Sequence, residues 1–75
     1  MTIEGRTIQR RAAIAILEAN TIGLPRYHRY ALDMRIEHVR GMIEEPDDEL
    51  FNRRLDSAWS ALFRAWAEHK KAREG

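Results

Sequence analysis

The chain has no cysteine, and its 75 residues include only two prolines and four glycines. Without cysteine, no disulfide can stabilise the fold and no thiolate can serve as a nucleophile. A single hydrophobic core in a chain of this length contributes only a few kcal/mol of net stability. The sequence therefore predicts one small domain that has little stability to spare.

Long apolar runs and an excess of charge are also missing. The longest apolar run, 12–17, is far shorter than the roughly 20 residues that span a bilayer, and the chain does not start with the pattern of a signal peptide. Lysine and arginine number 13 against 12 acidic residues, which excludes a strongly basic nucleic-acid binder. Hydrophobic residues make up 44% of the chain, which excludes a disordered tail. We expect a soluble, cytoplasmic protein.

Helical periodicity predicts three helices, at 6–20, 25–43 and 47–71, with frayed ends at 1–5 and 72–75. No stretch alternates in the manner of a strand, and there is no internal repeat or interdomain linker. The sequence predicts an all-α fold, a small three-helix bundle that forms a single domain over residues 1–75.

Prolines and glycines lie close to the places where helical periodicity changes. Gly23 and Pro25 separate the first helix from the second, and Pro46 precedes the acidic start of the third. Gly41 is the exception, because it falls inside the second helix near its end. It is interpreted either as a point of close packing or as an early stop of that helix.

The third helix has one broad apolar stripe of the kind that faces a core. Phe63 lies at the rim of this stripe, and we expect it at the edge of the core. The stripe consists of Phe51, Leu55, Ala58, Trp59, Leu62, Ala65 and Trp66.

The second helix has two apolar stripes, offset by more than a quarter turn. A helix that is apolar over more than half of its circumference is expected to have neighbours on two sides, so we predict that it is the central helix. The stripes are Leu32, Ile36, Val39 and Ile43, and Tyr27, Ala31, Met34 and Met42.

The first helix is apolar around most of its middle. Ile8, Ala12, Ala15 and Ala19 form a stripe of small and apolar residues, from which Ile14 and Leu17 point away. We expect unburied apolar surface around Ile14 and Leu17, which self-association or docking on another protein would cover. The alternative is a monomer with alanines left in solvent, since alanine is also the best helix former.

No motif indicates an enzyme, a cofactor or a metal. There is no Gly-x-Ser-x-Gly turn, no phosphate-binding glycine loop and no His-Glu-x-x-His helix. The histidines His28, His38 and His69 lack the spacing of zinc ligands. His38 falls on the apolar arc of the second helix, and we expect it in the core or in an interface.

Arginines near the start of the chain raise the possibility of nucleic-acid binding. Arg6 and Arg10 are one turn apart and could contact phosphates, with Arg11 beside them. Two helices joined by a glycine-containing break also suggest a helix-turn-helix, but the break is longer than usual and the second helix is mostly apolar. A small DNA- or RNA-binding regulator that uses these arginines and the second helix is the alternative hypothesis.

The preferred hypothesis is a non-enzymatic protein that binds another protein or a second copy of itself. Such a protein would be a regulator, an inhibitor or an assembly subunit, as small phage-encoded chains often are. Arg35 has no acidic residue three or four positions away, so it needs a partner elsewhere or must reach solvent. The predicted partner-binding residues are arginines and tyrosines, types that are frequent at binding hot spots: Arg26, Tyr27, Arg29, Tyr30 and Arg35.

Overall fold

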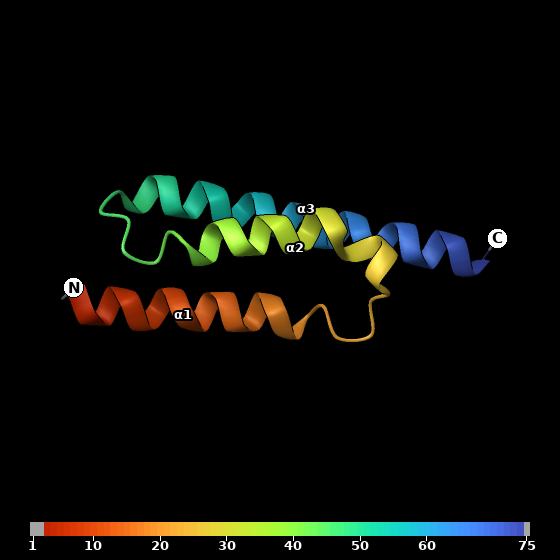
Figure 1. The fold of residues 1–75 in the computed structure, drawn as a ribbon, viewed down its shortest axis with the longest axis horizontal. Coiled ribbons are helices and arrows are strands. Elements are labelled where there is room, and N and C mark those ends of the chain that lie inside the picture. Colours follow the sequence, from red (N-terminus) through yellow and green to blue (C-terminus); the bar gives the residue numbers. More distant parts are fainter. Residues whose placement is uncertain (1–2, 75) are drawn as a thin grey trace.

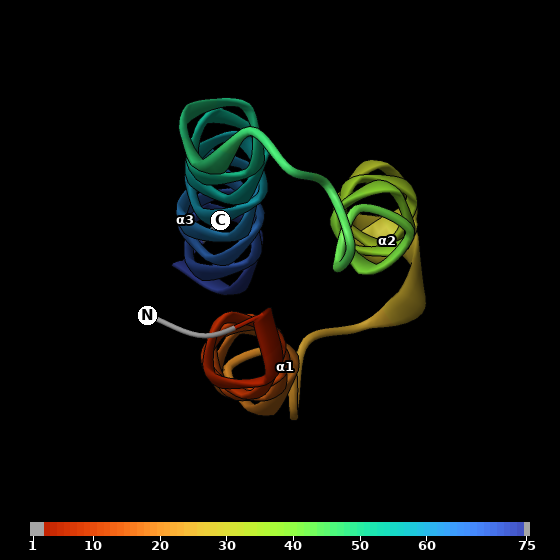
Figure 2. The ribbon, with the colours of Figure 1, turned by 90° about the vertical axis from the view of Figure 1, so that its left-hand side faces the viewer.

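The computed structural model describes residues 3–74, which form three helices: α1 (Ile3–Ala19), α2 (Arg26–Arg40) and α3 (Asp48–Glu74). The described part of the chain contains no strand, so the predicted all-α three-helix bundle is confirmed. The helices run up, down and up along a body that measures 49 × 18 × 15 Å (Figure 1). Seen end-on, they occupy the corners of a triangle (Figure 2).

The helix ends differ from the predicted ones by more than one residue in three places. α1 begins at Ile3 and α3 continues to Glu74, so both extend into segments that were expected to fray. α2 ends at Arg40, and the Gly41 N–H donates to the Glu37 carbonyl at 3.0 Å as the cap. Of the two interpretations of Gly41, the early stop is confirmed.

Side-chain hydrogen bonds at the two connections fix the positions of the helices. Asp47 caps α3, because its Oδ1 accepts hydrogen bonds from the backbone N–H groups of Glu49 and Leu50 at 3.0 and 3.3 Å. The indole of Trp66 on α3 donates to the Asn20 carbonyl at 2.8 Å. This bond ties the α1–α2 connection to the side of α3.

A single core runs along the axis of the triangle, with residues from all three helices. The apolar stripe predicted on α3 is confirmed, and so is the first of the two stripes on α2. The buried hydrophobic residues are Ile14, Leu17, Leu24, Leu32, Ile36, Val39, Phe51, Ala58, Leu62 and Ala65.

α2 packs on both α1 and α3, as predicted for the central helix, but its second stripe is not buried. Tyr27, Ala31 and Met34 are exposed, and only Met42 packs partly against the core. The reason is the triangular arrangement, in which α1 and α3 both lie on the same side of α2 (Figure 2). One stripe is enough to contact both neighbours, and the opposite side faces solvent.

The exposed apolar side chains of α1 lie on a different face of the helix from the one predicted. Ile14 and Leu17 are buried, which contradicts the prediction, whereas Ile8 and Ile16 are exposed. The spacing of buried positions from Arg10 through Ile14 to Leu17 is that of one helix face. Counting Arg10 as a surface residue concealed this face in the sequence.

Phe63 is also exposed, at 66%, rather than placed at the core edge as expected. Its ring lies 5.9 Å from that of Trp59, centroid to centroid. Among the described residues, no helix is long and apolar enough to cross a membrane.

Candidate binding surface

Arg10, one of the predicted nucleic-acid contacts, is built into the interior. Only 5% of it is exposed. Its Nη1 donates to three backbone carbonyls of the α2–α3 connection, those of Met42, Ile43 and Glu45, at 3.3, 2.9 and 2.6 Å. Its Nη2 lies 2.7 Å from Asp48 Oδ1. The guanidinium therefore makes its hydrogen bonds within the chain and is not available to a phosphate.

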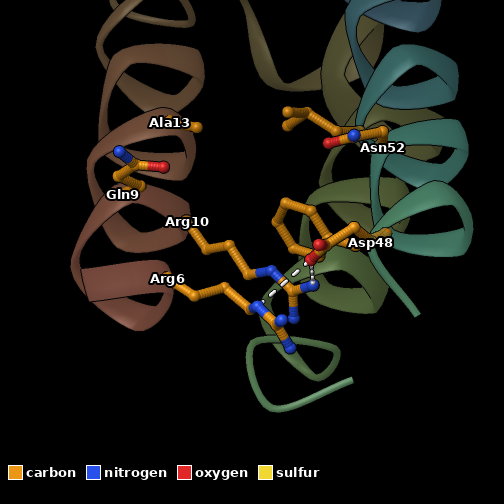
Figure 3. Close-up of a pocket in the computed structure, with 8 residues that line it drawn as sticks. Arg6, Gln9, Arg10, Ala13, Asp48 and Asn52 are labelled. Carbon is orange, nitrogen blue, oxygen red and sulfur yellow. Dashed lines mark hydrogen bonds and ion pairs between the residues drawn. The ribbon is translucent and has the colours of Figure 1, made fainter. Parts of the chain in front are cut away.

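The other two arginines of that hypothesis point in different directions. Arg6 reaches from α1 to the same carboxylate, as Figure 3 shows, and its Nε lies 3.2 Å from Asp48 Oδ1. Arg11 is exposed and has no ion pair within the described residues. The structure thus leaves Arg11 as the one member of this group that is both exposed and unpaired.

A pocket of about 340 Å³ opens between α1 and α3 beside this ion-pair cluster (Figure 3). Its walls include the apolar side chains of Ala13, Phe51 and Leu55, with the amides of Gln9 and Asn52 across from each other. Both of its arginines are paired with Asp48. Because both guanidiniums already contact this carboxylate, the pocket is best described as the seam between two helices.

In the groove between α1 and α2, every charged residue is in an ion pair with another residue of the groove. Arg29 pairs with Asp33 at 3.4 Å, and Arg40 pairs with both Glu18 and Glu37. Arg29, a predicted partner-binding residue, lies in this groove. It is separated from the other candidates, because it lies on the side of α2 that faces α1.

The outward side of α2 carries large exposed side chains. Tyr27 and Tyr30 are 76% and 75% exposed, and Met34 is 60% exposed. Arg26, at the start of the helix, is exposed as well. Tyr27, Tyr30 and Met34 recur at helical spacing, so they share one face with two smaller exposed neighbours. We call this the α2 outer face: Tyr27, Tyr30, Ala31, Met34 and His38.

Arg35 stands at the edge of the α2 outer face, next to α3. It is exposed, and its Nη1 donates a hydrogen bond to the Ser57 hydroxyl. Three neighbouring hollows, of about 40, 300 and 210 Å³, all include Arg35 in their lining. Arg35, which has no acidic residue within reach on its own helix, therefore lies where these three hollows meet.

Two more arginines, both from α3, line the hollows on either side of Arg35. Arg54 lines one together with His38, and Arg64 lines another together with Ser60. Neither Arg54 nor Arg64 has an ion pair among residues 3–74. We call this surface the basic groove: Arg35, His38, Arg54, Ser57, Ser60, Ala61 and Arg64.

The three histidines lie in two separate places. His38 is exposed in the basic groove, so the expectation that it lies in the core is wrong, whereas its place in an interface stays a prediction. His28 and His69 pack edge to face, with ring centroids 5.4 Å apart, and His69 also packs on Trp66. No group of three or more metal-binding side chains occurs within the described residues.

Sequence reasoning identified Arg35 but missed the two arginines that face it. Arg54, Ser57, Ala61 and Arg64 recur at the spacing of one helical face, which is the signal that could have been used. That signal alone does not show that this face borders Arg35, because the pairing of α2 with α3 decides it. α2 packs more extensively on α3 than on α1.

Comparison with known proteins gives no family or relative: no family model, no curated protein and no solved structure matches the chain.

Proposed function

We propose that this chain is a non-enzymatic protein that binds another protein through the α2 outer face. The observation that carries the proposal is the exposure of Tyr27, Tyr30 and Met34 on a helix whose other side supplies the core. Tyrosine and methionine contribute large contact areas at interfaces, and tyrosine adds a hydroxyl for hydrogen bonding. The protein would act as a regulator, an inhibitor or an assembly subunit.

The spacing of the exposed residues supports this proposal. Tyr27, Tyr30, Ala31 and Met34 occupy positions i, i+3, i+4 and i+7 of α2, the pattern by which a helix presents an apolar face to a partner. None of them is needed to close the core, which has its own stripe of Leu32, Ile36 and Val39 on the same helix. Isolated apolar residues on a surface need no explanation, but a contiguous row of them favours an interaction site.

A photo-cross-linking experiment tests the proposal. Benzoylphenylalanine is placed at Met34 in one protein and, as a matched control, at Ala72 in another, since Ala72 is exposed near the end of α3. In the cells that naturally make this chain, we expect position 34 to label a defined partner and position 72 to label little. Excess unmodified chain should compete with labelling, whereas a Tyr30→Glu, Met34→Glu chain should not.

Equal labelling at positions 34 and 72 would contradict the proposal. So would a double variant that reduces the labelling as strongly as the unmodified parent chain does. The mass of the adduct identifies a second copy of this chain if the partner is the chain itself. Circular dichroism of each variant shows that the helices are retained.

A further inference from the structure

We propose that the basic groove binds an acidic segment of the partner protein. This inference rests on the proposed function and adds the chemistry of the partner to it. Its foundation is a gathering of unpaired positive charge beside an apolar face: Arg35, Arg54 and Arg64 line adjoining hollows that begin where the α2 outer face ends.

The arginines of the groove differ from most others in the chain by lacking a carboxylate partner. Within residues 3–74, no aspartate or glutamate lines either of the two hollows that contain Arg54 and Arg64. Elsewhere the arginines are mostly neutralised by ion pairs, as is the case for Arg6, Arg10, Arg29, Arg40 and Arg53. A surface on which positive charge has been left unneutralised is complementary to negative charge on another molecule.

The groove also offers the right kinds of hydrogen-bond donor. A guanidinium can bind both oxygens of a carboxylate through two parallel N–H groups. The hydroxyls of Ser57 and Ser60 lie between the arginines and can donate to the same oxygens. Arg35 has a single hydrogen bond to a neutral hydroxyl, which an incoming carboxylate can replace.

The length of the groove fits a segment of polypeptide. Arg54 and Arg64 are separated by about 15 Å along α3, from the rise of a helix. This is about the distance that three turns of a helix cover, so acidic residues on successive turns of a bound helix could reach successive arginines.

The apolar hollow beside the groove favours a protein over a nucleic acid. Ala31 and Met34 line it together with Arg35 and His38. An amphipathic segment with one acidic edge and one apolar edge would cover both surfaces at once. A nucleic-acid backbone would satisfy the arginines but leave the methionine and the tyrosines without a partner, and the net charge of +1 adds no broad positive field.

Binding of a model peptide to the full chain tests this inference. The probe is a fluorescently labelled amphipathic peptide with leucines on one face and glutamates along its edge; the reference probe has glutamine at every glutamate. We expect the parent chain to bind the glutamate peptide more tightly at low salt, with an affinity that declines as salt is added. An Arg54→Gln, Arg64→Gln chain should bind it about tenfold more weakly, as two partly exposed ion pairs would contribute.

Arg53→Gln is the control for that variant. Arg53 is adjacent to Arg54, exposed, and already paired with Glu49 outside the groove. Its loss removes the same charge from the same turn of α3, so binding of the glutamate peptide should change less than twofold, as expected for a surface charge outside the contact. An equal loss for Arg53→Gln and for Arg54→Gln alone would show that only net charge matters, and it would overturn the inference.

Other outcomes would also overturn it. The first is equal binding of the glutamate and glutamine peptides. The second is groove-dependent binding of random duplex DNA without binding of the peptide, a result that would favour the nucleic-acid hypothesis. Concentration-dependent dimerisation that Arg54→Gln, Arg64→Gln abolishes would assign the groove to a second copy. If position 34 cross-links a defined partner and either of the first two results is also found, the proposed function is retained and this inference is wrong.

Discussion

Replacing Arg10 with alanine is expected to leave the chain largely unfolded at 25 °C. The Arg10 guanidinium bonds to three backbone carbonyls and to Asp48, and its carbon atom Cζ lies 4.3 Å from the centre of the Phe51 ring. Removing it takes a donor from three partly buried carbonyls and removes the guanidinium that covers the Phe51 ring. A loss of about 2–4 kcal/mol, from carbonyl acceptors left without this donor and from the lost packing, is comparable to the whole stability of a domain this small.

Urea denaturation followed by circular dichroism measures this effect, and Arg11→Ala is its control. Arg11 is the next residue along α1 but is exposed, so its replacement should change the free energy of unfolding by less than about 0.5 kcal/mol. Arg10→Lys should fall between the two, because an ammonium keeps the charge but cannot reach the carbonyls and the carboxylate with a planar fork. Equal denaturation midpoints for Arg10→Ala and Arg11→Ala would contradict the role assigned to Arg10.

Leu17→Ala is expected to have an effect of similar size, a loss of about 2–5 kcal/mol in the free energy of unfolding. Leu17 is completely buried and belongs to the core that all three helices share. The substitution loses the burial of the leucine side chain and leaves a cavity that the surrounding helices fill only in part. Its thermal midpoint should therefore fall steeply, and at the upper end of the range the chain would not fold.

Ile16→Ala provides the matched control for the face of α1. Ile16 precedes Leu17 and loses a side chain of the same size, but it is 58% exposed. We expect its replacement to cost less than about 1 kcal/mol, because little of the side chain is removed from water in the fold. A larger loss for Ile16→Ala than for Leu17→Ala would mean that α1 packs with the opposite face.

The three helices and most of the core were predictable because they depend on local pattern. The stripe from Phe51 to Trp66 on α3 is an unbroken apolar face, and the breaks at Gly23 and Pro46 mark where the helices end. The early stop of α2 at Gly41 was one of two interpretations that the residue itself suggested. Local signals of this kind need no knowledge of which helix packs against which.

The face of α1 was not predictable in the same way. Periodicity treats an arginine as a surface residue, yet Arg10 is buried because the α2–α3 connection directs carbonyl groups at it. Those acceptors lie more than thirty positions further along the chain. Once Arg10 is assigned to the core, Ile14 and Leu17 follow at helical spacing, and Ile8 and Ile16 move to the surface.

The candidate site was predictable only in part for a similar reason. Tyr27, Tyr30 and Arg35 were identified from residue type and from the lack of an intrahelical partner for Arg35. Arg29 lies apart from them because of the position of α1. Arg54 and Arg64 lie beside Arg35 because α2 packs on α3. A surface assembled from two helices depends on their register, which a single helical pattern does not contain.

Mapping where the glutamate peptide binds tests most directly whether the surface made by α2 and α3 is the binding surface. The peptide is titrated into the isotope-labelled full chain, and the backbone amide shifts are followed by nuclear magnetic resonance. We expect the shifted amides to cluster at residues 31–38 and 54–64, which carry the basic groove and its apolar neighbour. Shifts concentrated at residues 8–19, where Ile8 and Ile16 are exposed on α1, would contradict this assignment.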